Sequence, residues 1–235
     1  MIYQNMRTHL KIPPTFSRPD LRSASAVRQR SRTFRHLSVA GAVVMCAMAG
    51  EPVLKPIFNG RDLAGWSVGS EGPSANLNWR VENGVIVGES NEKLVGSNLA
   101  TEKSYGDFVL EFEGRWTGAE IDTGVIIRLP QIQFQIGVSR SMARDMTGSW
   151  CLSPDNPVRY PESGQAKDWE KHFKAGAWNT YRIEVRGAIF TAWINGHQVS
   201  RYSDSKYAAP APLRLQFHGG LKMKLEFRNL RLAEL

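Results

Sequence analysis

Two segments of the chain carry glutamine, arginine and histidine at alternate positions, a spacing that suits one face of a sheet. Residues 131–136 alternate glutamine with Ile and Phe, and residues 213–218 alternate polar residues with Leu and Phe. Successive side chains of a strand point to opposite faces, so the apolar residues predict a buried face and the polar residues an outer one. The polar residues are Gln131, Gln133, Gln135, Arg214, Gln216 and His218. They offer donors and acceptors for hydroxyl and carbonyl groups, although an ordinary solvated sheet face is the alternative.

His218 is the strongest single candidate for chemistry. Imidazole exchanges a proton near neutral pH, so His218 can serve as an acid, a base or a metal ligand. Arg128 can polarise a carbonyl group, although its face is less clear because Gly124 and Ile126 share its parity. A histidine or arginine in a strand is also compatible with a purely structural role.

The segment 139–178 is long, polar and rich in Trp, Pro and Gly. Loops of this length in a compact domain are often lids or binding loops. Trp150 and Tyr160 lie in this segment and are predicted to stack on a ring of a ligand. The alternative is that they fill the edge of a core.

Alternation of apolar and polar residues dominates the chain from residue 56 onward. Asn-Gly pairs at 83–84 and 195–196 lie between such runs and predict two hairpin turns. Only residues 165–174 suit a short helical turn. Short strands with frequent Gly and Asn turns predict an all-β sandwich or jelly roll. No internal repeat or linker interrupts residues 50–235, which are expected to form one domain.

The formal charge of +8 has its origin in residues 1–49. These hold eight of the 30 basic residues and one of the 22 acidic residues, which leaves 22 basic and 21 acidic residues for the rest. A nearly neutral body gives no reason to expect contacts with phosphate groups. Nucleic acid is therefore not expected as a partner.

An uncharged apolar run, residues 37–49, follows Arg32 and Arg35 and ends in Ala47-Met48-Ala49. This arrangement predicts a secretory signal peptide with cleavage near Ala49, and a periplasmic or extracellular location. The run is shorter than the roughly 20 residues of a membrane-spanning helix. We therefore expect membrane contact only through this segment; an uncleaved anchor or a buried helix is the alternative.

Cysteine offers little chemistry in this chain. Cys46 would leave with the signal peptide, so Cys151 would be the only cysteine of the exported protein. A nucleophilic role for Cys151 lacks a clear histidine partner, and a bystander thiol is expected. The chain also lacks a glycine-rich phosphate loop, paired cysteines at zinc spacing and a Gly-x-Ser-x-Gly motif.

Six short motifs follow one another through the body of the chain. They are residues 57–66 (IFNGRDLAGW), 79–86 (WRVENGVI), 105–113 (YGDFVLEFE), 123–128 (TGVIIR), 176–179 (GAWN) with 195–196 (NG), and 215–219 (LQFHG) with 227–230 (FRNL). In this order they resemble the 3-keto-disaccharide hydrolase family. The resemblance extends from about residue 56 to residue 233.

The resemblance implies a concanavalin A-like jelly-roll sandwich and an exported protein that acts on glycosides already oxidised to a ketone at C3. The ketone acidifies the C2 proton, so elimination can expel the anomeric leaving group, and hydration of the enone completes a net hydrolysis. This chemistry needs a base at C2, a group that polarises the C3 carbonyl and an acid at the leaving oxygen. A saccharide is the expected ligand, no organic cofactor is expected, and a divalent metal stays open.

With this likeness in mind, roles can be assigned to the candidate residues. The residues expected to carry the chemistry are His218, Arg128 and Gln133. The residues expected to contact the saccharide are Gln135, Gln216, Arg214, Trp150, Tyr160 and Asp122.

The chain departs from the family pattern in three places, and one of them is Gly137-Val138-Ser139, where an acidic residue often follows the strand in the family. Gln133 replaces a glutamate in the strand that usually reads E-V-Q-I, and an amide does not exchange a proton at ordinary pH. Asp122 begins the Asp-Thr-Gly segment that stands where the family usually has Asn-Ser-Gly. His218, Asp122, Asp145 or Asp155 could act as the base instead. Without such a base, we expect a non-catalytic carbohydrate-binding module or, less readily, a structural cell-surface protein.

Overall fold

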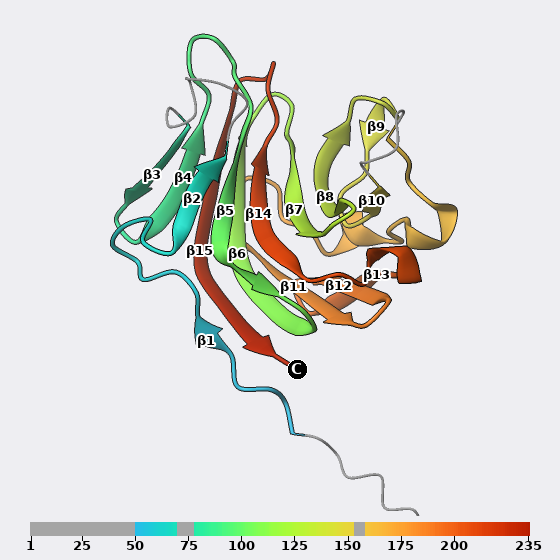
Figure 1. The fold of residues 1–235 in the computed structure, drawn as a ribbon. Coiled ribbons are helices and arrows are strands. Elements are labelled where there is room, and N and C mark those ends of the chain that lie inside the picture. Colours follow the sequence, from blue (N-terminus) through green and yellow to red (C-terminus); the bar gives the residue numbers. More distant parts are fainter. Residues whose placement is uncertain (1–49, 70–77, 153–157) are drawn as a thin grey trace, which may run out of the picture. The chain divides into compact units, whose positions relative to one another are not determined.

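The computed structural model describes residues 50–69, 78–152 and 158–235 (Figure 1). These residues belong to the unit Ala49–Leu235. The predicted signal peptide, its cleavage position at Ala49 and the candidate base Asp155 lie outside the described residues. Within the described ranges, no helix is long and apolar enough to cross a membrane.

The described part of the chain is built from strands and three short 3-10 helices. The strands are β1 (Lys55–Pro56), β2 (Trp66–Gly69), β3 (Trp79–Glu82), β4 (Val85–Glu89), β5 (Ser97–Tyr105), β6 (Phe108–Gly118), β7 (Asp122–Arg128), β8 (Ile132–Ser139), β9 (Arg144–Asp145), β10 (Trp150–Leu152), β11 (Asn179–Arg186), β12 (Ile189–Ile194), β13 (His197–Ser203), β14 (Ala211–Phe217) and β15 (Met223–Glu234). The 3-10 helices are η1 (Glu162–Gly164), η2 (Trp169–Lys171) and η3 (Ser205–Tyr207).

Two antiparallel sheets form a sandwich. The eight-stranded sheet has the order β13-β12-β11-β6-β15-β4-β3, with β1 paired to β15. The seven-stranded sheet has the order β10-β8-β7-β14-β5-β2, with β9 paired to β8. Figure 1 shows β15, β6 and β11–β13 behind β2, β5, β14 and β7. The predicted all-β jelly-roll sandwich is confirmed.

Alternating side chains fill the space between the sheets, as the sequence pattern predicts. Ile132, Phe134 and Ile136 of β8 are buried in the main core, and so are Leu213, Leu215 and Phe217 of β14. Burial of apolar side chains is the main favourable contribution to folding. Because side chains alternate along a strand, this burial leaves the polar residues of β8 and β14 on the outer face of the seven-stranded sheet.

Both predicted Asn-Gly turns are present. Asn83 and Gly84 have φ angles of 49° and 78° between β3 and β4, and Asn195 and Gly196 have φ angles of 50° and 81° between β12 and β13. Positive φ at both central residues defines the type I′ turn that suits a two-residue hairpin. The short helical turn expected within 165–174 is η2.

The segment 139–178 differs from the long binding loop that the sequence predicts. It contains β9, β10, η1 and η2, and Trp150 is the first residue of β10, opposite Phe134 of β8. The indole is fully buried, and its ring centroid lies 5.7 Å from those of Phe134 and Phe190. The prediction that Trp150 stacks on a ligand is therefore wrong, because its ring is part of the core.

Candidate functional site

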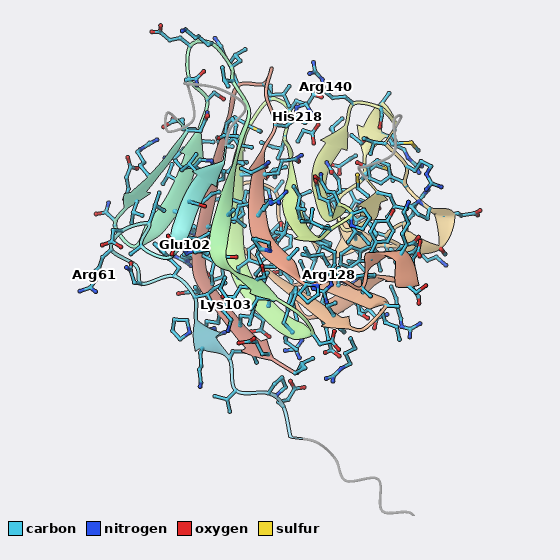
Figure 2. The ribbon with its side chains drawn as sticks, viewed as in Figure 1. Arg61, Glu102, Lys103, Arg128, Arg140 and His218 are labelled. Atoms are coloured by element: carbon cyan, nitrogen blue, oxygen red, sulfur yellow. The ribbon has the colours of Figure 1, made fainter. Side chains whose placement is uncertain are left out.

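A hollow of about 440 Å³ lies on the outer face of the seven-stranded sheet. Its floor comes from β7, β8 and β14, and its rim comes from the residues that follow β8 and β14. The lining residues are Asp122, Gln133, Gln135, Ser139, Arg140, Ser141, Cys151, Val158, Tyr160, Gln216 and His218. Figure 2 shows His218 and Arg140 near each other at the same end of this sheet. We call this space the Asp122 hollow.

An amide network forms the floor of the Asp122 hollow. The Nε2 of Gln133 donates to the Oε1 of Gln135 at 2.8 Å and to the Oε1 of Gln216 at 2.9 Å. The Nε2 of Gln135 donates in turn to the Oδ1 of Asp122 at 2.9 Å. Gln133 and Gln135 are each only 2% exposed, so their side chains are fixed by hydrogen bonds rather than solvated. Gln135 thus holds the carboxylate of Asp122, and Gln133, which is also bonded to Gln216, holds Gln135 in turn.

Gly124 makes this arrangement possible. It lies in β7 opposite Gln135 of β8. A Cβ atom at Gly124 would lie 2.5 Å from the Nε2 and 2.9 Å from the Cγ of Gln133, and 2.4 Å from the carbonyl oxygen of Phe134. Interiors are packed too closely to absorb such contacts without movement. The absence of a side chain at 124 leaves the space that the Gln133 amide occupies.

Asp122 is the only carboxylate among the described lining residues of the hollow. Its residue is 5% exposed. Burial raises the pKa of Asp122, because desolvation penalises the charged form; His218, the Gln135 hydrogen bond and Arg140 oppose that effect without cancelling it. A carboxyl group with a raised pKa is a better proton acceptor, once ionised, than an exposed one.

His218 lies at the end of β14, with its ring beside Asp122. Its Nδ1 is 2.8 Å from the carbonyl oxygen of Gly219, so that nitrogen carries a proton and donates it. Its Nε2 lies 3.8 Å from the Oδ2 of Asp122, a distance beyond a direct hydrogen bond. When both groups are unprotonated at these atoms, two acceptors face each other. The geometry therefore places an imidazole nitrogen and a carboxylate oxygen side by side in the hollow.

The backbone around His218 is held by a close approach of two chain segments. A Cβ atom at Gly219 would lie 2.8 Å from the backbone nitrogen of Gly96, and one at Gly96 would lie 2.7 Å from the nitrogen of Gly219. The N–H of Gly220 donates to the carbonyl oxygen of Leu94 at 2.8 Å. The contact fixes the turn after β14 against the segment before β5, and with it the position of the imidazole.

Tyr160 and Cys151 close one side of the hollow. The hydroxyl of Tyr160 has side-chain hydrogen bonds to Ser139 and Cys151. Burial raises the pKa of Cys151 to about 12 and also raises that of Tyr160. Cys151 therefore remains a neutral thiol at physiological pH, in line with the bystander role expected for it. Tyr160 does line the site, but as a wall that is 9% exposed.

Arg128, predicted to polarise a carbonyl, is not brought to the hollow. Its guanidinium is buried and donates to the carbonyl oxygens of Tyr105 at 3.0 Å and Gly106 at 2.6 Å, with Asp107 3.5 Å away. The β7–β8 register shifts between Ile126 and Arg128, which breaks the parity of the strand at its end. Figure 2 shows Arg128 far along the sheet from His218. Arg128 secures the β5–β6 connection instead.

Arg140, and not Arg128, is the arginine that lines the Asp122 hollow. It immediately follows β8 and lines the hollow, and its positive charge lowers the pKa of Asp122 against the larger effect of burial. Arg140 lies one residue beyond the strand that carries Gln133 and Gln135, so the alternation of residues within that strand did not identify it. Asp145, a candidate base, lies on β9 and accepts the N–H of Thr147 at 2.9 Å, and it does not line the Asp122 hollow.

Arg214 lies on the same sheet face, in a larger hollow of about 960 Å³ that also includes Gln216 and His218. The structure thus brings together Asp122, Gln133, Gln135, Tyr160, Gln216 and His218, with Arg214 next to them. It leaves out Arg128 and Trp150. Among the described residues, no group of three or more His, Cys, Asp or Glu side chains is placed to hold a metal ion.

The fold and the site define a class: an antiparallel β-sandwich with a polar, amide-lined hollow on one sheet. Residues 54–233 match the 3-keto-alpha-glucoside-1,2-lyase-like domain family. The match covers most of the chain, so the protein belongs to this family, as its motifs suggest. The comparison with curated protein sequences gives no significant match.

Solved structures share the fold at low sequence identity. A predicted glycosyl hydrolase from Parabacteroides distasonis is 20% identical with a TM-score of 0.55, and the alignment covers 77% of this chain and 94% of the other. The carbohydrate-binding module CBM66 from Bacillus subtilis is 11% identical with a TM-score of 0.52, over 72% and 96% of the two chains. LamA from Zobellia galactanivorans, solved with laminaritriose and laminaritetraose, is 12% identical with a TM-score of 0.50, over 77% and 94%.

Proposed function

We propose that the protein eliminates the anomeric leaving group from 3-keto-glucosides and that Asp122 is the base. The observation that carries this proposal is a buried carboxylate, with a pKa raised by burial, held by the amide of Gln135 beside His218. Family membership supports the proposed substrate class. The polar lining of the hollow supports a hydroxyl-rich ligand, because amides and hydroxyls can each donate and accept.

The reaction is a β-elimination across C1 and C2 followed by hydration. The ketone at C3 acidifies C2–H; the carboxylate of Asp122 takes that proton, a double bond forms between C1 and C2, and the bond from C1 to the leaving oxygen breaks. Protonated His218 donates its Nε2 proton to the leaving oxygen, so an alcohol departs. Water then adds across the double bond of the enone, and the sum is hydrolysis. Positioned acid and base groups of this kind contribute about 10²–10⁴ each to rate.

Negative charge develops on the C3 oxygen as the C2 proton leaves. Arg140, at the rim of the hollow, is the cation placed to stabilise that charge. The half-buried amide of Gln216 lies on the floor and can orient a hydroxyl group of the sugar, and the Nε2 of Gln133 positions it. Gln133 has no part in proton transfer, because an amide does not titrate in this range.

Two of the departures from the family pattern are complementary on this account. The position that carries glutamate in the family is Gln133 here, and the position that carries asparagine is Asp122. In the structure these side chains lie on neighbouring strands, joined through the amide of Gln135. One carboxylate is therefore kept in the hollow, moved from β8 to β7.

Export completes the proposal. Residues 1–49 are proposed to act as a basic leader and signal peptide, and the folded domain acts in the periplasm or outside the cell. The apolar run at 37–49 after Arg32 and Arg35 supports this placement.

A second candidate function is saccharide binding without turnover. The observation that favours it is the replacement of the family glutamate by Gln133, together with an amide-rich floor that already has internal hydrogen bonds. Such a module would bind sugar in the Asp122 hollow and leave it unchanged.

Turnover of a defined substrate separates the two candidates. The full chain is incubated with methyl 3-keto-α-glucoside, and release of 3-keto-glucose is followed, with Asp122→Asn and the control Glu113→Gln in parallel. Release that Asp122→Asn abolishes and Glu113→Gln preserves supports the lyase. No release by the unaltered protein, with saturable binding by calorimetry, supports the binding module.

A further inference from the structure

The Asp122 hollow adjoins a second, larger hollow on the same sheet. The second hollow has a volume of about 960 Å³, against about 440 Å³ for the first, and extends over β2, β5 and β14. Gln216 and His218 line both spaces, so they form the boundary between them. A ligand that fills both must cross these two side chains. We call the second space the β2–β5–β14 groove.

The groove is polar along its length. Ser67, Asn98 and Glu102 lie on the β2 and β5 side, and Arg214 lies on β14. Figure 2 shows Glu102 on the β2 and β5 side of the sheet. Phe217 is the only Phe, Tyr or Trp among its described lining residues, and its side chain is buried in the core. The groove therefore offers hydrogen bonds and no exposed Phe, Tyr or Trp ring, which suits a hydroxyl-rich ligand better than an aryl group.

Arg214 is placed to contact a ligand in the groove. It lies on β14 opposite Ala100 of β5 and Ile126 of β7, and it is half-buried. No carboxylate in the described part of the chain forms an ion pair with it, whereas Arg115, Arg182 and Arg228 on the other sheet are all paired. A guanidinium presents several N–H donors in one plane and can bind two neighbouring oxygens at once.

We propose that the β2–β5–β14 groove binds the leaving-group sugar of the substrate and that Arg214 is its specificity-determining residue. This inference rests on the proposed lyase function, because it takes the sugar that loses its C2 proton to lie over Asp122. The scissile bond then lies above Gln216 and His218. His218 is thereby next to the leaving oxygen, the atom to which it donates a proton.

The experiment compares two substrates that share the oxidised sugar and differ in the leaving group. The full chain is assayed with 3-keto-trehalose, whose leaving group is glucose, and with methyl 3-keto-α-glucoside. Arg214→Ala is expected to lower kcat/KM for 3-keto-trehalose about tenfold more than for the methyl glycoside, the loss expected for one hydrogen bond to a charged group. The matched control is Arg201→Ala, an exposed arginine on β13 of the other sheet, which leaves the ratio unchanged.

A second variant fills the groove instead of removing a donor. Ala100 lies between Ser67 and Arg214 in the strand register, so Ala100→Trp places a large ring in the groove. It is expected to produce the same selective loss. Equal losses on both substrates in both variants, or no loss in either, would overturn the inference. Thermal unfolding verifies that each variant is folded.

Binding of unoxidised sugars tests the groove independently of the reaction. Amide chemical shifts of the unaltered protein and of Arg214→Ala are followed during titration with trehalose and with methyl α-glucoside. Tighter binding of trehalose that is lost in Arg214→Ala supports the groove even when no substrate is turned over, and the lyase proposal alone then fails. If both substrates are turned over and the ratio of their kcat/KM values is the same in the unaltered protein and in Arg214→Ala, the groove proposal is overturned and the lyase proposal stands.

Discussion

The outer faces of the two sheets are both polar, but their polar groups are used in different ways. On the eight-stranded sheet, charged residues of β6, β11 and β15 face one another across the strands and form ion pairs. These include Arg182–Glu111 at 2.7 Å, Arg228–Glu113 at 2.5 Å and Arg115–Glu226 at 2.7 Å. On the seven-stranded sheet, the Asp122 hollow holds one carboxylate, one imidazole, three glutamines and Arg140 instead.

The difference separates a face whose charged groups pair with one another from a face whose polar groups can bind a ligand. Cross-strand ion pairs consume the donors and acceptors of both partners and stabilise the sheet by small amounts. Amides fix the orientation of Asp122 without adding a countercharge, so the carboxylate stays reactive. The two faces therefore differ in how their charged groups are paired.

The largest effect is expected at the carboxylate of the hollow. Asp122→Asn preserves the shape of the side chain and an acceptor for the Gln135 amide, but removes the base. We expect kcat for a 3-keto-glucoside to fall by about 10³ or more, as for loss of a general base. Glu113→Gln, the same change on the paired face, should leave kcat within about twofold. Steady-state kinetics of the two purified variants measures both, and a similar loss in both would remove the distinction between the faces.

Moving the carboxylate back to β8 tests the same distinction from the other side. The double variant Asp122→Asn with Gln133→Glu restores the acid and amide positions usual in the family. Because the two side chains are joined through Gln135, we expect it to recover at least about tenfold of the activity lost in Asp122→Asn. A double variant as inactive as the single one would show that the base is tied to position 122.

Loss of His218 should depend on the leaving group. His218→Gln removes the acid, which matters most when the departing oxygen is basic. We expect kcat/KM to fall by about 10² for a methyl glycoside and by clearly less for a nitrophenyl glycoside, whose leaving group needs little protonation. Equal losses on the two substrates would contradict the role of an acid.

Arg128 should behave as a structural residue in spite of its charge. Arg128→Met leaves the carbonyl oxygens of Tyr105 and Gly106 without their donors in a buried place. We expect the free energy of unfolding to fall by about 2–4 kcal/mol, the cost of one or two unsatisfied buried groups. The kcat/KM of the folded fraction should stay within about twofold. Urea unfolding and kinetics of the same sample test both statements.

The smallest effect concerns the pH dependence of stability. The pKa of Asp122 is raised in the folded state, so the folded protein binds this proton more tightly than the unfolded chain does. The stability that this proton contributes is present below the unfolded pKa and is lost as the pH rises through the folded pKa. Asp122→Asn should therefore be more stable than the unaltered protein at pH 7, with a difference that vanishes below about pH 4. Urea midpoints across this range would show whether it does.

Local pattern predicted most of the fold. Period-two alternation and the turns at Asn83-Gly84 and Asn195-Gly196 are properties of a few adjacent residues, and the structure has them where the sequence places them. Parity also placed Gln133, Gln135 and Gln216 on the outer face beside His218. Because β8, β7 and β14 are neighbours in the sheet, these residues lie together with Asp122.

Prediction from the sequence was wrong where pairing between distant segments sets the position of a side chain. The register shift after Ile126 turns Arg128 away from the hollow, and no local signal marks it. Trp150 is buried because a three-residue strand pairs with the edge of β8, a contact invisible in a polar segment of this kind. Arg140 was missed because it follows a strand rather than alternating within it.

Hydrogen exchange at C2 tests the central claim most directly. The full chain converts methyl 3-keto-α-glucoside in D₂O, and the 3-keto-glucose released at early times is examined by NMR, with a protein-free control for spontaneous exchange. Elimination by Asp122 and hydration of the enone predict product that carries deuterium at C2, at a rate that falls together with turnover in Asp122→Asn. Product that keeps its protium at C2 would show direct hydrolysis at C1 and would contradict the account.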